Sequence, residues 1–144
     1  MEIYSFKNYR KKVYSQFDQD GVLEHIFNLI GVTNKYFVEF GSNGCIDGCG
    51  NTAYLREKFN MNGLLMDGSE YPYGIKGKKP DFERKIEFIK AENINELFDK
   101  HSVPQSFDFL SIDIDGEDYY VMDALNLDKF KPRVICIEIN HTIP

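Results

Sequence analysis

The chain has 144 residues, is 42% apolar and 28% charged, and carries a net charge of −6. These values describe one soluble globular domain that can bury a core, and they argue against general nucleic-acid binding. No apolar run is long enough to cross a bilayer, so we expect no membrane partner. Three cysteines, an odd number, argue against a disulfide framework and favour a cytoplasmic protein.

The hydrophobic pattern predicts an N-terminal helix followed by alternating strands and helices. The first helix spans residues 19–30 and stops at Gly31. The predicted strands are 36–40, 63–67, 86–90, 107–112 and 133–139, and the helices between them are 52–60, 93–98 and 118–125. We therefore expect an α/β fold with a doubly wound, mostly parallel sheet of about five strands in the order 3-2-1-4-5 and helices on both faces. The single domain 1–144 divides into a helical segment, 1–31, and a βα core, 35–144.

The first predicted strand runs directly into a glycine-rich loop, which is typical of a ligand site at the carboxyl end of a parallel strand. The loop lacks the second glycine of the dinucleotide pattern, and the acid Glu39 would repel a pyrophosphate. S-adenosylmethionine has no phosphate and offers an ammonium and a sulfonium. The loop residues that we expect to bind it, with Glu39, are Gly41, Ser42, Asn43, Gly44 and Asn51. The alternative for Glu39 is a buried acid held by backbone donors.

Two further strand ends extend this predicted site. Asp67 ends the second strand, where a carboxylate can accept hydrogen bonds from both hydroxyl groups of a ribose, and Gly68 follows it. Glu92 and Asn93 follow the third predicted strand, where we expect the adenine ring. The alternative for Asn93 is that it caps the next helix.

Several stretches of the chain together resemble the FkbM-type methyltransferases. They are residues 15–21, 37–41, 51–52, 63–65, 107–116 and 132–140, and they extend over nearly the whole chain. The resemblance implies a class I enzyme that depends on S-adenosylmethionine and methylates hydroxyl groups of sugars or small natural products. It also implies that Glu39, Gly41 and Asp67 hold the cofactor and that Asp113 lies beside it.

The chain departs from the family pattern at two places. Cys45 stands where the family usually has a glycine. The chain also ends at Pro144, before the last two strands that a full class I fold would add. The fifth strand would then have an unpaired edge, so we expect either a truncated or minimal domain or a homodimer that covers this edge.

The candidate catalytic residues follow the fourth and fifth strands. If the fourth strand extends far enough, Asp113 and Asp115 lie on one side of it by alternation, and His141 faces them from the end of the fifth strand, beside Glu138 and Asn140. A carboxylate or a histidine there can accept the proton of a hydroxyl substrate. Two alternatives remain for this acidic cluster. Asp115 caps the helix that follows, or the cluster, which includes Asp118, holds Mg²⁺ or Ca²⁺.

Three residues near the N-terminus extend the predicted site. Gln16, Gln19 and Asp20 reach over the cofactor if the first helix packs beside the crevice; otherwise Asp18 is simply the N-cap of that helix. Cys45 and Cys49 are too few for a structural zinc site, so we expect no zinc, and the site that we favour contains no metal.

The sequence therefore predicts a methyltransferase with a sugar or another small molecule as substrate. Two other function classes stay open. One is a non-catalytic or truncated module that binds S-adenosylmethionine, and the other is an NAD-dependent oxidoreductase.

Overall fold

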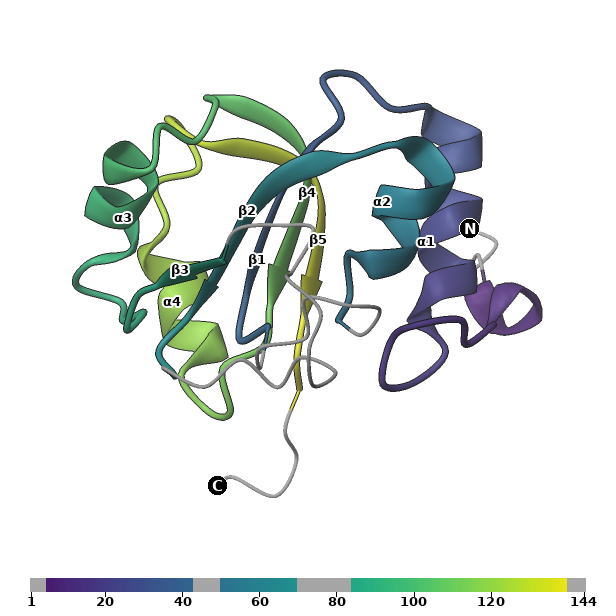
Figure 1. The fold of residues 1–144 in the computed structure, drawn as a ribbon, viewed down its shortest axis with the longest axis horizontal. Coiled ribbons are helices and arrows are strands. Elements are labelled where there is room, and N and C mark those ends of the chain that lie inside the picture. The colour runs from purple at the N-terminus through teal and green to yellow at the C-terminus, as the bar shows by residue number, and fades with distance from the viewer. Residues whose placement is uncertain (1–4, 43–49, 70–83, 140–144) are drawn as a thin grey trace, which may run out of the picture.

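The computed structural model describes residues 5–42, 50–69 and 84–139, which form a sheet between two layers of helices (Figure 1). The helices are η1 (Phe6–Tyr9, a 3-10 helix), α1 (Gln19–Ile30), α2 (Ala53–Phe59), α3 (Ile94–Lys100) and α4 (Asp118–Ala124). The strands are β1 (Tyr36–Phe40), β2 (Asn62–Asp67), β3 (Arg84–Ile86), β4 (Ser106–Ile112) and β5 (Lys131–Ile137).

The five strands are all parallel and lie in the order β3-β2-β1-β4-β5, which confirms the predicted fold class and strand order. β1 lies at the centre, with Glu39 opposite Leu65 of β2 and Ser111 of β4. β5 is the edge of the described sheet, as the dimer prediction requires. Within the described residues, no helix has the length and apolar character that a membrane span needs.

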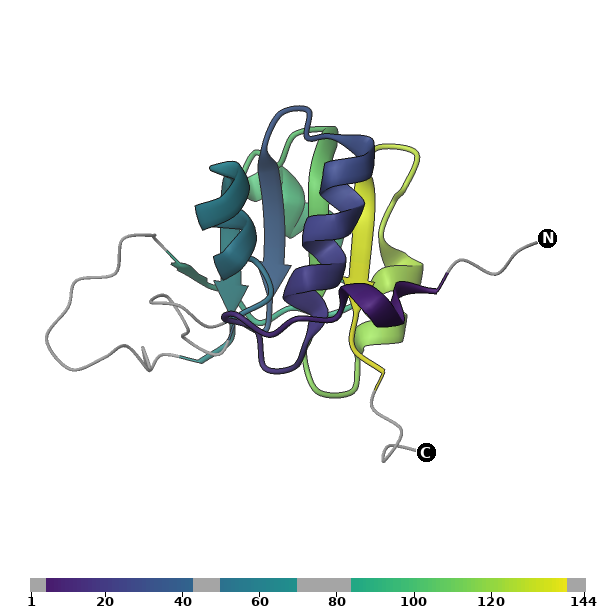
Figure 2. The ribbon, with the colours of Figure 1, turned by 90° about the vertical axis from the view of Figure 1, so that its right-hand side faces the viewer.

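Each face of the sheet is covered by two helices (Figures 1 and 2). On one face, Phe27 of α1 and Leu55 of α2 belong to the same buried cluster as Phe37 of β1. On the other face, Phe98 of α3 and Phe40 of β1 belong to a second cluster. Because side chains alternate along a strand, Glu39 lies on the face of Phe37, toward the start of α2.

The predicted third strand is wrong in its position. β3 is a three-residue strand at Arg84–Ile86, whereas the prediction began at Ile86. After Ile86 the chain leaves the sheet, because the Asn93 side chain accepts a hydrogen bond from Lys90 N and donates one to Phe88 O. The resulting turn buries Ile89 in the core of the α3 and α4 face.

A buried acid joins three segments at the amino ends of the strands. Asp108 of β4 is 0% exposed and accepts hydrogen bonds from Thr33 N and Oγ1, from Lys35 N and from Arg133 Nη1. These hydrogen bonds connect the loop between α1 and β1 to β4 and β5. Asp108 therefore lies at the end of the sheet opposite to the predicted site.

Candidate functional site

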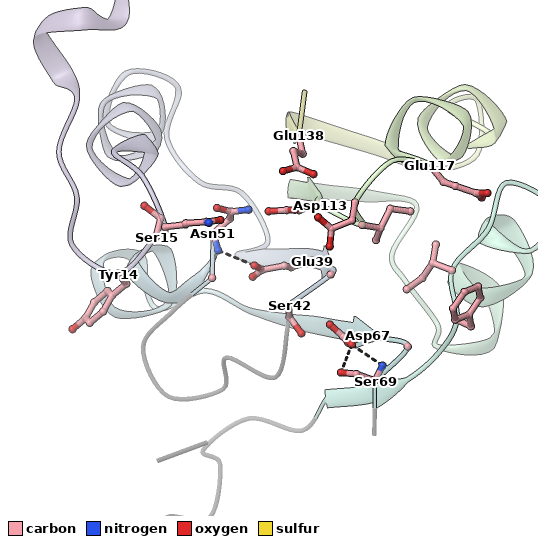
Figure 3. Close-up of a pocket in the computed structure, with 18 of the residues that line it drawn as sticks. Tyr14, Ser15, Glu39, Ser42, Asn51, Asp67, Ser69, Asp113, Glu117 and Glu138 are labelled. Atoms are coloured by element: carbon pink, nitrogen blue, oxygen red, sulfur yellow. Dashed lines mark hydrogen bonds between the residues drawn. The ribbon is translucent and has the colours of Figure 1, made fainter. Parts of the chain in front are cut away.

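A cavity of about 890 Å³ lies at the carboxyl ends of the central strands (Figure 3). That volume lies within the range of ligand pockets in proteins. The described residues that line it are Lys12, Tyr14, Ser15, Gln16, Glu39, Gly41, Ser42, Gly50, Asn51, Asp67, Gly68, Ser69, Phe88, Ile89, Asp113, Ile114, Asp115, Glu117 and Glu138. The cavity therefore brings together the strand ends that the sequence pointed to, because carboxyl ends of parallel strands meet at one edge.

Glu39 lines the cavity and is also held by the protein. Its carboxylate accepts hydrogen bonds from Asn51 N at 2.7 Å, from Thr52 N at 3.1 Å and from the Thr52 hydroxyl. The residue is 3% exposed, and its burial raises the pKa of the carboxyl group. Glu39 thus fixes the start of α2 against β1, as the alternative interpretation of this acid expected.

Two glycines let the backbone pass close to this acid and to β4. Gly41 has φ +71°, and a Cβ atom there would lie 1.3 Å from the Asp113 carbonyl oxygen. Gly50 has φ +99°, and a Cβ atom there would lie 2.9 Å from Glu39 Oε1. Any larger residue at Gly41 would have to displace the backbone of Asp113. This close approach, which the sequence indicated only as a glycine-rich loop, places the ends of β1 and β4 side by side.

Asn51 connects α1 to the end of β4. Its side-chain amide donates to Ser111 Oγ at 2.9 Å and also hydrogen-bonds the Asp113 carboxyl group. Its Oδ1 atom accepts a hydrogen bond from Gln19 Nε2 of α1 at 2.5 Å. Asn51, predicted as a cofactor ligand, therefore has its side chain engaged with α1 and with the end of β4.

Ser42 is a buried hydroxyl that lines the cavity. It is 3% exposed, and its Oγ atom has no hydrogen-bond partner among the described residues. A buried polar group normally makes a hydrogen bond, since leaving it unsatisfied has a free-energy cost. Ser42 is thus available to donate to or accept from a bound ligand.

The end of β2 forms a second polar corner. Asp67 Oδ1 accepts hydrogen bonds from Ser69 N at 2.7 Å and Ser69 Oγ at 2.6 Å, shown as dashed lines in Figure 3. Arg84 Nη1 lies 3.8 Å from the same oxygen, and both side chains are less than 10% exposed. A Cβ atom at Gly68 would lie 2.9 Å from the Phe88 ring, so the wall is closely packed here. Asp67 and Gly68 therefore line the cavity as predicted.

Glu92 and Asn93 are not among the described residues that line the cavity. Asn93 precedes α3, but its side chain makes no capping hydrogen bond and instead holds the turn after β3. Phe88 and Ile89 line the cavity in this region, and the Phe88 side chain is 70% exposed. The sequence reasoning missed these two residues because it kept them inside a strand.

Asp113 and Glu138 form a carboxyl pair at the ends of β4 and β5. Both side chains line the cavity (Figure 3), and they lie close enough for Asp113 to raise the pKa of Glu138. Burial and then the neighbouring acids Asp118, Asp115 and Glu39 raise the pKa of Asp113. Burial and then Asp113 raise the pKa of Glu138, and the buried Glu138 Oε2 atom has no hydrogen-bond partner within residues 5–42, 50–69 and 84–139.

The sequence led us to expect Glu138 opposite Asp113 across the crevice, but Glu138 was not among the predicted catalytic residues. The signal that identifies it is the strand register. Ile112 lies opposite Ile137, so the residue after each strand end falls next to the other.

Asp115 does not lie beside Asp113 by strand alternation, and that expectation is wrong. β4 ends at Ile112, and Asp115 has φ +58° in an exposed turn that lines the cavity. Asp118 holds this turn by accepting hydrogen bonds from Ile114 N and Gly116 N, both at 2.9 Å. The acid that caps the turn is therefore Asp118.

The segment before α1 also reaches the cavity. Residues 10–18, here called the N-terminal strap, contribute Lys12, Tyr14, Ser15 and Gln16 to its lining. Gln16 thus lies where it was predicted, whereas Asp20 is fully buried beneath the strap. Asp18 is the N-cap of α1, and its side chain pairs with Arg10 at 2.5 Å without making a capping hydrogen bond.

Some predicted residues lie outside the described part of the chain. They are Asn43, Gly44, Cys45, Cys49, Asn140 and His141. Within residues 5–42, 50–69 and 84–139, no three His, Cys, Asp or Glu side chains are grouped as a metal ion requires.

Comparison with known proteins gave one match. A family model described as "Methyltransferase FkbM domain" matches residues 41–144. Neither the curated proteins nor the solved structures gave a match. The matched residues contain the loop after β1 and the ends of β2, β4 and β5.

Proposed function

Because this match extends over most of its length, the chain belongs to the FkbM methyltransferase family, and we propose that it transfers a methyl group from S-adenosylmethionine to a substrate hydroxyl. The observation that carries the proposal is the continuous cavity that joins Asp67 to the Asp113 and Glu138 carboxyl pair. One end suits a ribose and the other suits a group that loses a proton.

The charge of the cavity supports the choice of cofactor. Six of its described lining residues are acids, namely Glu39, Asp67, Asp113, Asp115, Glu117 and Glu138, whereas Lys12 is the one cation among them. Such a surface repels a pyrophosphate and attracts a sulfonium, which disfavours the NAD alternative. When bound, S-adenosylmethionine would supply an electrophilic methyl group.

The residues present fit this cofactor at several points. Asp67 would accept hydrogen bonds from the ribose hydroxyls, and Phe88 and Ile89 would pack against the adenine ring. Gly41 lines the cavity at the end of β1, and the Ser42 hydroxyl, which has no partner among the described residues, would bind a polar group of the amino-acid part.

The carboxyl pair would accept the proton of the substrate hydroxyl. Burial and neighbouring acids raise the pKa of both Asp113 and Glu138, so ionising both carboxyl groups at once is disfavoured. Glu138 Oε2, which has no partner in the described part of the chain, would be available for the substrate proton as the methyl group moves from sulfur to the substrate oxygen. The acceptor that suits this site is a neutral hydroxyl compound such as a sugar or a small natural product. A catalytic role for His141 stays a prediction.

The first experiment is ligand-dependent thermal unfolding with S-adenosylhomocysteine and NAD. At a ligand concentration of about 100 times its dissociation constant, S-adenosylhomocysteine should stabilise the protein by about 2.7 kcal/mol, and NAD should not. Asp67→Asn should lose most of that ligand-dependent shift. Asp123→Asn, an exposed acid on α4 outside the cavity lining, should keep it. A shift with NAD alone would reverse the assignment.

Methyl transfer itself is tested with a labelled methyl donor and a panel of hydroxyl compounds. A label that is stable to mild base would identify an ether, whereas a base-labile label would identify a carboxyl ester. An ester product would contradict the proposed acceptor while leaving the cofactor assignment intact.

A further inference from the structure

The N-terminal strap forms one side of the cavity. Four of its residues line the cavity, and Ser15 is 0% exposed. Figure 3 shows Tyr14 and Ser15 near Asn51 and Glu39, at the end of the cavity away from Asp67 and Ser69. The strap therefore faces the part of the cavity away from Asp67, the residue proposed to bind the ribose.

A single buried carboxylate sets the course of the strap. Asp20 is 0% exposed, and its Oδ2 atom accepts hydrogen bonds from Val13 N at 2.8 Å, Tyr14 N at 2.7 Å and Ser15 N at 2.9 Å. Three backbone donors on one oxygen hold three consecutive residues in one conformation. Asp20 thus determines how the side chains of the strap are presented to the cavity.

Close backbone packing holds the strap against α1. A Cβ atom at Gly21 would lie 2.1 Å from Tyr9 O, so only glycine fits at this position. Gly21 N donates to Lys11 O at 3.0 Å, and the Tyr14 hydroxyl donates to Glu57 of α2. These contacts make the strap part of the folded domain.

The strap also carries the one cation among the described residues that line the cavity. Lys12 Nζ donates to Gln16 O at 2.9 Å, which directs the ammonium along the strap and leaves its other two protons available. The rest of the described lining contributes acids and neutral groups. A carboxylate in this cavity would therefore find a charged partner at Lys12 and repulsion elsewhere.

We propose that the strap is the carboxylate-binding end of the cavity, where Lys12 pairs with the carboxylate of the cofactor's amino-acid part and Asp20 is the positioning residue. This inference rests on the proposed function, because it assigns a place to one group of the proposed cofactor. The alternative partner for Lys12 is a carboxylate of the methyl acceptor.

Isothermal titration calorimetry without any acceptor separates the two sources. The probes are S-adenosylhomocysteine and its decarboxylated analogue, which keeps the amine and lacks only the carboxylate. Lys12→Met should weaken binding of S-adenosylhomocysteine about tenfold, the loss typical of one hydrogen bond to a charged group. Binding of the decarboxylated analogue should be unchanged or tighter, because loss of the Lys12 ammonium makes the cavity more negatively charged.

The matched control is Lys11→Met. Lys11 is adjacent in sequence, but its ammonium lies 5.3 Å from the centre of the Tyr54 ring and it does not line the cavity. Both ligands should bind this variant as they bind the wild-type protein. Lys12→Gln gives a second, smaller change of side chain and should behave as Lys12→Met does.

Asp20→Asn tests the positioning role. Loss of the charge that holds three backbone N–H groups should lower the affinity for S-adenosylhomocysteine more than that for the decarboxylated analogue. A merely structural role would lower both affinities by the same factor. The ratio of the two affinities is therefore the measured quantity, with circular dichroism to verify the fold.

The possible outcomes distinguish a failure of the strap inference from a failure of the proposed function. If the wild-type protein binds neither ligand, the proposed function fails and the inference fails with it. If the wild-type protein binds both ligands, but Lys12→Met leaves the affinity ratio unchanged, the strap inference alone is overturned. In that case, a loss seen in Lys12→Met only when an acidic acceptor is added would assign Lys12 to the acceptor.

Discussion

The two ends of strand β4 each place an acid close to its neighbours, and the two acids behave in opposite ways. At the amino end, Asp108 is fully buried, yet its pKa is lowered. Burial opposes that shift, but the hydrogen bonds from Arg133 and Thr33 outweigh it. At the carboxyl end, the pKa of Asp113 is raised, first by burial and then by the surrounding acids.

The difference between them is the partner and not the degree of burial. Asp108 has Arg133 Nη1 at 2.7 Å and further hydrogen bonds from Thr33 and Lys35. Asp113 faces Glu138, another acid, across the β4 and β5 pair. An acid with every partner satisfied stabilises a fold, whereas an acid facing another acid in a cavity is arranged for chemistry.

The largest expected effect is at the amino end. Asp108→Ala should lower the free energy of unfolding by about 3–5 kcal/mol, because it removes the charged partner of Arg133 and leaves Thr33 N and Lys35 N without their acceptor. Urea denaturation measures the change. Asp123→Ala, at an exposed acid, should stay within about 0.5 kcal/mol of the wild-type protein. If Asp108→Ala lost little stability, the contrast between a stabilising Asp108 and a reactive Asp113 would be contradicted.

At the carboxyl end we expect a loss of activity instead of stability. Asp113→Asn should reduce methyl transfer at least about 100-fold, the lower range for a general acid–base group. Its unfolding midpoint should remain at or above that of the wild-type protein, since one charge leaves an acidic cluster. Steady-state kinetics with an identified acceptor, together with thermal unfolding, test both parts. A variant that keeps full activity would exclude Asp113 from the reaction.

Two glycines sharpen the contrast between the ends. Gly31, beside the amino ends, has φ +66°, and a Cβ atom there would meet nothing within 4 Å, so Gly31→Ala should lose only about 1 kcal/mol of stability. Gly41, at the carboxyl ends, has a similar φ, but a Cβ atom there would overlap the Asp113 carbonyl oxygen. Gly41→Ala should therefore lose about 2 kcal/mol or more. Equal losses in urea denaturation would show that the backbone contact at Gly41 is unimportant.

The smallest effect is a dependence of stability on pH. The folded-state pKa of Glu138 is raised, so its carboxyl group favours folding below the unfolded value near 4.5, and this contribution disappears as the pH rises through the folded value. Glu138→Gln should therefore be more stable than the wild-type protein at pH 7, by less than about 1 kcal/mol. Near pH 4 the two proteins should be equally stable.

Asp108 should make stability depend on pH in the opposite direction. Its pKa is lowered, so its contribution is present above the unfolded value of 3.8 and disappears as the pH falls through the folded value. Thermal unfolding of wild-type, Glu138→Gln and Asp108→Asn proteins from pH 3 to pH 8 should show both trends. If Glu138→Gln gave the same difference at every pH, the raised pKa would be contradicted.

The sequence was informative where the signal is local. Buried strands, helix-forming patterns and acids at strand ends are visible in runs of a few residues, so the strand order and the places of Glu39, Asp67 and Asp113 followed from the chain alone. It was misleading where side chains redirect the backbone. Asn93 ends the β3 region early, and Asp118 turns the chain after β4.

Sequence alone therefore determined the sheet and the edge at which the site lies, because hydrophobic periodicity and strand ends are encoded locally. The tertiary structure decided the partners, because they come from distant segments. It paired Asp113 with Glu138, connected Asn51 to Gln19 and Ser111, and brought the strap over the cavity through Asp20. A carboxylate's chemistry depends on what lies within a few ångströms of it, and only the folded chain determines that.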